Sequence, residues 1–237
     1  SEAELAALSE RMETWHPVEI IAWSALTFGP RLAATSSFQT QSLPLLYWLG
    51  KVAPLTDVFF LNTGFHFPET IRYKETLRVA FGITIKELEN INGIAHFKQQ
   101  YPRLYEENPH MCCYLNKVEP LQRALTHYDA WLTGLRRDQT QARSNVPILS
   151  LNSEGVLKIC PMVNVSADMV DRFIDKFDLP RHPLRDKGYM SIGCEPCTQA
   201  VAEGEDYRAG RWAGSQKTEC GLHFDEKTGK IVRNNKQ

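Results

Sequence analysis

Short apolar runs alternate with longer segments of helical periodicity between residues 18 and 177, and this alternation constrains the fold more than any other feature. Strands that alternate with helices of ~10–15 residues indicate βαβ units and a mainly parallel sheet. We therefore predict an α/β fold in which helices flank a mainly parallel sheet. The sequence predicts strands over 31–35, 57–61, 83–88 and 129–133, and helices over 5–12, 18–27, 43–49, 68–81, 118–127 and 169–177.

Ligands bind beyond the carboxyl ends of the strands in such a sheet. The loops 36–42, 62–67 and 134–143 each follow a predicted strand, so we expect the site there. The regular pattern fades after Gly193, and residues 203–237 are mostly polar. We therefore predict one α/β domain over 1–202 and a mobile C-terminal segment over 203–237.

Length and charge exclude several classes of protein. The chain has 237 residues, 43% of them apolar, which suits one domain of ordinary size and excludes disordered and collagen-like chains. With 27 basic and 28 acidic residues, its net charge of −1 gives no reason to expect nucleic acid or a membrane surface as a partner. No apolar run reaches the ~18 residues that a membrane span needs. Residues 1–14 do not resemble a signal peptide, so we expect a reducing cytoplasm, where six cysteines suggest metal, redox or catalytic roles.

The polar loop 36–42 opens a predicted helix, where serine hydroxyls and backbone N–H groups can hold an anion. A serine-rich turn that merely caps the helix is the alternative. The spacing of Ser37 and Ser42 also resembles the pyrophosphate loop, Ser-Gly-Gly-x-Asp-Ser. Phe38 and Gln39 replace its glycines and Gln41 its aspartate, which argues against ATP chemistry and leaves room for another phosphate or a sulfate.

Two further loops carry candidate ligand-binding residues. Arg136, Arg137 and Arg143 follow a predicted strand, and their forked donors suit phosphate or sulfate oxygens. A solvated surface loop is the alternative. The turn Asn62-Thr63-Gly64 allows close approach of a ligand to the backbone, or is an ordinary strand-to-helix turn. Arg208 and Arg211, at the start of the polar C-terminal segment, add a weaker signal of the same kind.

The cysteines fall into three kinds. Cys112-Cys113 and the pair Cys194 and Cys197 supply four soft ligands, which suit zinc or an iron–sulfur cluster, with a redox dithiol at 194 and 197 as the alternative. Cys160 lies in an apolar, strand-like stretch, and we expect it to be a small buried side chain.

Cys220 differs from the others because it lies in the polar segment, within Lys217-Thr218-Glu219-Cys220-Gly221-Leu222-His223. Lys217 and His223 favour its thiolate, whereas Glu219 opposes it. A reactive thiol on such a segment can reach a bound substrate and then a second protein. The alternative is an incidental exposed thiol.

Together these motifs resemble the assimilatory sulfonucleotide reductases, which act on adenylyl sulfate (APS) or phosphoadenylyl sulfate (PAPS), over residues 18 to 223. The motif 217–223 is the most specific match, and Asn62 stands where the family commonly has Asp. The resemblance implies an adenine-nucleotide α-hydrolase-like fold with a modified pyrophosphate loop at 36–42. It also implies a [4Fe–4S] cluster on Cys112, Cys113, Cys194 and Cys197, which in this family accompanies APS.

The resemblance further implies a mechanism. The Cys220 thiolate attacks the sulfate sulfur, AMP leaves, and a protein thiosulfonate remains until thioredoxin or a similar dithiol releases sulfite. Cations must neutralise the phosphosulfate, and Lys117 shares a helical face with Cys113 between cluster and substrate. We expect substrate contacts from Ser36, Ser37, Gln39, Ser42, Asn62, Thr63, Gly64, Lys117, Arg136, Arg137, Arg143, Arg208, Arg211 and His223.

Three alternatives stay open at this point. The chain can prefer PAPS or accept both nucleotides, because the sequence does not locate a pocket for the 3′-phosphate. It can be an ATP-dependent enzyme of the pyrophosphate-loop class. It can also be a non-enzymatic iron–sulfur or zinc protein that senses redox state. The sequence predicts no oligomeric state.

Overall fold

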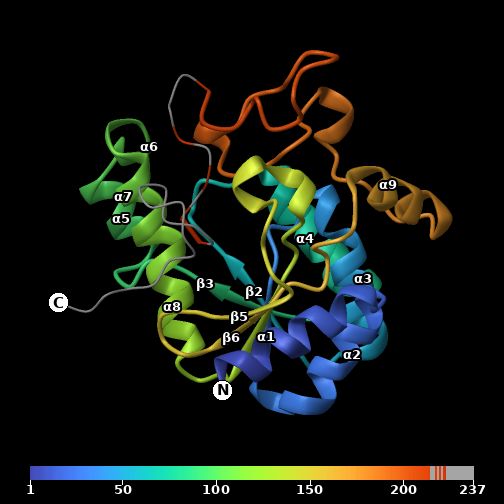
Figure 1. Ribbon diagram of the computed structural model, residues 1–237. Coiled ribbons are helices and arrows are strands. Elements are labelled where there is room, and N and C mark those ends of the chain that lie inside the picture. The colour runs from blue at the N-terminus through green and yellow to red at the C-terminus, as the bar shows by residue number, and fades with distance from the viewer. Residues whose placement is uncertain (214–216, 218, 220, 223–237) are drawn as a thin grey trace.

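The computed structural model of the chain describes residues 1–213, 217, 219, 221 and 222. Its centre is a six-stranded sheet with the order β3-β2-β1-β4-β6-β5, in which β5 pairs antiparallel with β6 and every other pair is parallel (Figure 1). This confirms the predicted mainly parallel sheet. The strands are β1 (Leu32–Thr35), β2 (Asp57–Leu61), β3 (Thr84–Leu88), β4 (Ala130–Thr133), β5 (Leu149–Leu151) and β6 (Leu157–Ile159).

Helices cover both faces of this sheet. Figure 1 shows α5 to α8 gathered on one side and α1 to α3 on the other, while the orange segment after α9 runs across the top of the molecule. The helices are α1 (Glu2–Arg11), α2 (Pro17–Phe28), α3 (Leu43–Val52), α4 (Pro68–Phe81), α5 (Ile94–Gln100), α6 (Leu104–Glu107), α7 (Pro109–Cys113), α8 (Glu119–Leu125) and α9 (Ala167–Lys176), with a π-helical turn over Tyr114–Val118.

The buried side chains form two layers because alternate residues of a strand face opposite sides of the sheet. Leu32 and Ala34 pack on the side that α2, α3, α4 and α9 cover, whereas Ala33 packs against Leu121 and Leu125 of α8. Full burial of a leucine side chain contributes about 2 kcal/mol. The burial of all four residues of β1, three of them apolar, therefore follows from its place between two helical layers.

The predicted boundaries agree best with the structure where proline or glycine marks the end of an element. α4 begins at Pro68, whose missing N–H costs nothing in the first turn, and it ends before Gly82, which adopts a left-handed φ of 64°. Both bounds match the predicted helix 68–81. The structure adds α5, α6, α7 and β5, which the sequence pattern did not predict. These elements have three to seven residues each, too few to show a clear period.

The topology of the sheet fixes where a ligand can bind. β1 lies between β2 and β4, so the chain crosses to one side of β1 and later to the other. Such a reversal opens a crevice at the carboxyl ends of the strands. The loops that follow β1, β2 and β4 therefore meet there, as expected.

The C-terminal segment contains buried side chains in its described part. Trp212 is 5% exposed, and its N–H donates to the Cys197 carbonyl at 3.0 Å. Lys217 and Glu219 are also buried. The division of the chain at residue 202 stays a prediction. Among the helices of the described residues, none has the length and apolar character needed to cross a membrane.

Candidate active site

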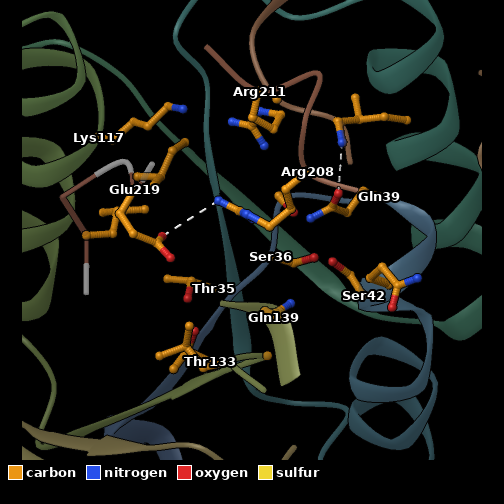
Figure 2. A pocket seen from close by; sticks show the side chains of 18 of the residues that line it. Thr35, Ser36, Gln39, Ser42, Lys117, Thr133, Gln139, Arg208, Arg211 and Glu219 are labelled. Carbon is orange, nitrogen blue, oxygen red and sulfur yellow. Dashed lines mark hydrogen bonds and ion pairs between the residues drawn. The ribbon is translucent and has the colours of Figure 1, made fainter. Parts of the chain in front are cut away.

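A pocket of 160 Å³ opens at the carboxyl ends of β1, β2 and β4. Figure 2 shows Ser36 and Ser42 on one side of it and Lys117, Arg208 and Arg211 facing them. Hydroxyl, amide and cationic groups thus converge on one space, which suits an anionic ligand. The predicted residues that line the pocket are Ser36, Ser37, Gln39, Ser42, Lys117, Arg143, Arg208 and Arg211.

The loop after β1 presents its polar groups to the pocket through an unusual backbone. Phe38 adopts a φ of 51°, and its fully buried ring packs edge-on against Phe60. A left-handed φ is normally a glycine conformation, so Phe38 keeps the backbone of a glycine position while it fills the core. Ser42 makes no capping hydrogen bond to α3 and lines the pocket instead. This favours the ligand-binding interpretation of the loop over a simple helix cap.

Arg136 and Arg137 do not line the pocket, although Arg143 does. Arg137 points to the opposite side, where its guanidinium donates to Glu13 at 2.7 Å and Asn164 at 2.6 Å. These bonds to Arg137 hold the pKa of Glu13 below its ordinary value.

Arg136 is 1% exposed and donates to Asp138 at 3.0 Å and to Gln41 at 2.6 Å. It lies behind the pocket wall and supports Gln41, which lines the pocket. A run of arginines after a strand cannot reveal which of them points inward, because the direction depends on the turn that follows.

The Asn62-Thr63-Gly64 turn borders a second cavity rather than the pocket. Thr63 is buried, and its hydroxyl lies 3.3 Å from the Cys194 sulfur. Gly64 has a φ of 72°, and a Cβ there would lie 2.2 Å from a methyl carbon of Ile94, so no other residue fits without rearrangement. The turn therefore fixes one wall of the cysteine site.

All four predicted metal ligands line this second cavity, which we call the cysteine cavity. The helix changes character immediately after Cys112-Cys113. Over Tyr114–Val118 the helix is π-helical, and the Glu119 N–H donates to the carbonyl five residues back. Pro120, the second residue of α8, has no N–H to donate, which disfavours regular α-helix at this point.

Burial raises the pKa of Cys112 to about 11, and the neighbouring Cys194 adds to this effect while Lys117 opposes it. Burial likewise raises the pKa of Cys197. Thiols in such a place stay protonated unless a metal or cation binds them. Cys160 is fully buried in the main core, which confirms its predicted role as a small apolar side chain.

The chemistry of the cavity can be compared with what a cluster needs. Within the described part of the chain, no three His, Cys, Asp or Glu side chains are arranged to hold a metal ion. A [4Fe–4S] cluster is larger than an ion, and its four thiolates stand further apart. Four cysteines around one cavity fit that donor set. The buried indole N–H of Trp212, which also lines the cavity, has no hydrogen-bond partner within the described residues and is available to a sulfur acceptor.

The two cavities share a wall, because Lys117 and Trp212 line both. Arg211 stacks on the Trp212 ring at 4.5 Å, and the Lys217 ammonium lies 5.6 Å from the ring centre. Trp212 has a φ of 50°, an uncommon conformation for a tryptophan that the surrounding contacts must hold in place.

Several residues that line the pocket were not predicted from sequence, among them His66, Gln139 and Trp212. His66 follows the Asn-Thr-Gly turn, and its Nε2 lies 2.9 Å from the Leu61 carbonyl. Burial lowers its pKa to about 4. Position after a strand was the available signal for His66 and Gln139. Cys220 and His223, predicted for catalysis and substrate binding, lie outside the described residues.

Comparison with known families agrees with the fold and the site. The chain matches the phosphoadenosine phosphosulfate reductase domain over residues 31–200, and it belongs to this family of sulfonucleotide reductases. It is 41% identical over 226 residues to the adenosine 5′-phosphosulfate reductase of Streptomyces coelicolor, covering 93% of this chain and 95% of that protein. It is 42% identical over 226 residues to the phosphoadenosine 5′-phosphosulfate reductase of Gloeobacter violaceus, covering 92% and 93%.

Solved structures show the same architecture. The phosphoadenylyl-sulfate (PAPS) reductase of Candida auris, a phosphate complex, superposes with a TM-score of 0.72 and 29% identity, over 85% of this chain and 98% of that one. The FMN adenylyltransferase of Candida glabrata superposes with a TM-score of 0.54 at 13% identity, over 80% of this chain and 62% of that one, and shares the fold alone.

Proposed function

We propose that the chain reduces APS to sulfite and AMP with thioredoxin or a similar dithiol as reductant, as a step of sulfate assimilation. The observation that carries the proposal is the convergence of Lys117, Arg208 and Arg211 on the pocket at the carboxyl ends of the strands. Relatives named adenosine 5′-phosphosulfate reductase, from Streptomyces coelicolor and Bacillus subtilis among others, cover most of the chain and support the choice of APS.

The cations act on the charge that develops as the reaction proceeds. The Cys220 thiolate attacks the sulfate sulfur and forms an S–S bond, while the bond from that sulfur to the AMP phosphate oxygen breaks with its electron pair. Both the nucleophile and the group under attack are anionic, so positive charge must surround them. Lys117, Arg208 and Arg211 supply that charge from fixed positions, and Ser36 and Ser42 supply hydroxyl donors opposite them.

The second half of the reaction consumes two thiols. One thiolate of the reductant attacks Cys220, releases sulfite and forms a mixed disulfide, and its second thiol then frees Cys220 and leaves the reductant oxidised. The two electrons that reduce the sulfur come from the thiols of the reductant, so no other redox group has to change its oxidation state. A free catalytic thiol and a dithiol donor require a reducing compartment, and we propose the cytoplasm.

We further propose that Cys112, Cys113, Cys194 and Cys197 hold a [4Fe–4S] cluster in the cysteine cavity. When bound, the cluster supplies a fixed negative charge beside the pocket. Lys117 lies in the wall between the two cavities and offsets that charge while it faces the substrate.

PAPS is the second candidate substrate, favoured by the relative from Gloeobacter violaceus named for that nucleotide. The test is turnover of APS and PAPS side by side with reduced thioredoxin, measuring sulfite and the released nucleotide. We expect faster turnover of APS, no turnover of either in Cys220→Ser, and full activity in Cys160→Ala, the matched control. Turnover by Cys220→Ser, or consumption of ATP, would overturn the proposal.

A further inference from the structure

Glu219 places a carboxylate inside a pocket otherwise rich in cations. It is 3% exposed and lies among the residues that line the pocket (Figure 2). Its Oε1 accepts hydrogen bonds from Arg143 Nε at 2.8 Å and from the Thr140 hydroxyl at 3.0 Å, and its Oε2 accepts from Arg143 Nη2. Arg208 lies 3.8 Å from Oε2. Burial alone would raise the pKa of Glu219, but the Arg143 guanidinium holds it below the ordinary value.

Arg143 contacts this carboxylate through one edge of its guanidinium group. Its Nε and Nη2 both donate to Glu219, and its Nη1 donates to Gln139. A guanidinium presents five N–H donors in one plane, and the bonds to Glu219 and Gln139 use three of them, including the whole edge formed by Nε and Nη2. All three of these bonds go to side chains of the protein, although Arg143 also lines the pocket, as predicted from sequence.

A second buried charge lies two residues earlier in the chain. Lys217 is 4% exposed, its ammonium lies 3.3 Å from Nδ1 of His110 on α7, and it faces the Trp212 ring. Lys217 thus contacts the helix that carries the Cys112-Cys113 pair, whereas Glu219 contacts the arginine loop. Lys217 and Glu219 thus carry opposite charges and contact different parts of the fold.

We propose that Glu219 and Arg143 are a positioning pair that fixes the chain at Glu219 against the pocket, and that Arg143 acts through Glu219 rather than by binding substrate. Cys220 follows Glu219 directly in the sequence, so the pair sets where the chain enters the catalytic residue. This inference rests on the proposed function, because it assigns Cys220 the attack on sulfur.

Steady-state kinetics separate positioning from substrate binding. We expect Glu219→Gln and Arg143→Lys each to lower kcat about 100-fold, since a displacement of about 1 Å costs that much, with KM changed less than threefold. Glu203→Gln, an exposed glutamate of the same segment, is the matched control and keeps full activity. A rise in KM for Arg143→Lys with kcat unchanged would show that Arg143 binds substrate, and would overturn the proposal.

Alkylation of Cys220 by iodoacetamide without nucleotide tests the pair independently of turnover. Peptide mass spectrometry measures the labelling rate at Cys220, and slow labelling of fully buried Cys160 verifies that each variant is folded. We expect Glu219→Gln and Arg143→Gln each to raise the rate severalfold, and the double variant to add nothing further, because the residues act as one unit. Independent, additive effects would overturn the pairing. The two tests can also disagree. If the labelling rates of the variants are coupled but the wild-type protein turns over neither APS nor PAPS, the Glu219–Arg143 pair stands and the proposed function is refuted.

Discussion

The side-chain amide of Asn62 donates to the Glu87 carboxylate at 2.7 Å, while its carbonyl oxygen accepts the Gly64 N–H at 3.0 Å. Glu87 in turn pairs with Lys74, a lysine 2% exposed whose ammonium lies 5.0 Å from the centre of the Phe60 ring. Lys74 also pairs with Glu75 at 3.1 Å, so Glu87 is one of its two acidic partners, and Asn62 links the Lys74–Glu87 pair to the turn beside the cysteine cavity.

Replacing Asn62 by Asp should destabilise the fold by about 1–3 kcal/mol, because a carboxylate cannot donate to Glu87 and repels it. The double variant Asn62→Asp/Glu87→Gln restores a donor between the two positions, so we expect it to be more stable than the sum of the single changes. Urea unfolding measures the free energies, and exposed Glu89→Gln is the matched control. Additive losses would show that the two side chains do not interact.

Replacing Gly64 by Ala should cost more than the same change at Gly82. Both glycines have positive φ, 72° and 64°, but a Cβ at Gly82 meets nothing within 4 Å, whereas at Gly64 it meets Ile94. We expect about 1 kcal/mol at Gly82 from backbone conformation alone, and about 1–3 kcal/mol more at Gly64 from overpacking. Ile94→Ala should recover part of the excess at Gly64. Equal costs at the two glycines, measured by urea unfolding, would contradict the crowded turn.

Stability should fall as the pH drops from about 6.5 to about 4 because of His182. Burial lowers its pKa to about 4, and the neutral ring accepts the Leu184 N–H at 3.2 Å and contacts the Thr70 hydroxyl at 2.9 Å. The unfolded chain binds the proton at a higher pH than the folded one, so the full contribution is present above 6.5 and about 3 kcal/mol is lost by pH 4.

Urea unfolding across this pH range is the measurement. His182→Asn should remove its share of the pH dependence and leave the share of His66, whose pKa burial also lowers to about 4, while His127→Asn, an exposed control, should leave it unchanged. An unaltered slope in His182→Asn would assign the pH dependence to other groups.

Iron and acid-labile sulfide in the purified protein should depend on the cysteine cavity alone. We expect brown protein with both components in the wild type and in Cys160→Ala, and colourless protein in Cys194→Ser and Cys112→Ser. Removal of iron by a chelator should bleach the wild type. Zinc in place of iron and sulfide would refute the cluster.

Much of the fold could be predicted because its signals are local. The apolar runs at 57–61 and 130–133 gave β2 and β4, and the Pro68 and Gly82 boundaries gave α4. The short helices α5 to α7 carry no comparable signal, since their positions depend on packing around the cysteine cavity.

The sequence predicted which residue types form the site better than it predicted which side chains point into the pocket. Serines and arginines at strand ends marked the pocket, but only three-dimensional structure separates Arg143, which points inward, from Arg137, which bonds Glu13. The burial of Glu219 also escaped prediction, because a charged residue is buried only where a distant partner meets it, and Arg143 lies 76 positions away in the chain.

Because Lys117 and Trp212 belong to both cavities, the enzyme has in effect two chambers with a common partition. Neither chamber can be enlarged, narrowed or recharged by changing those two side chains without altering the other. Attempts to redesign nucleotide preference should therefore begin at the far wall, around Ser36 and Ser42, where the cysteine cavity is left untouched.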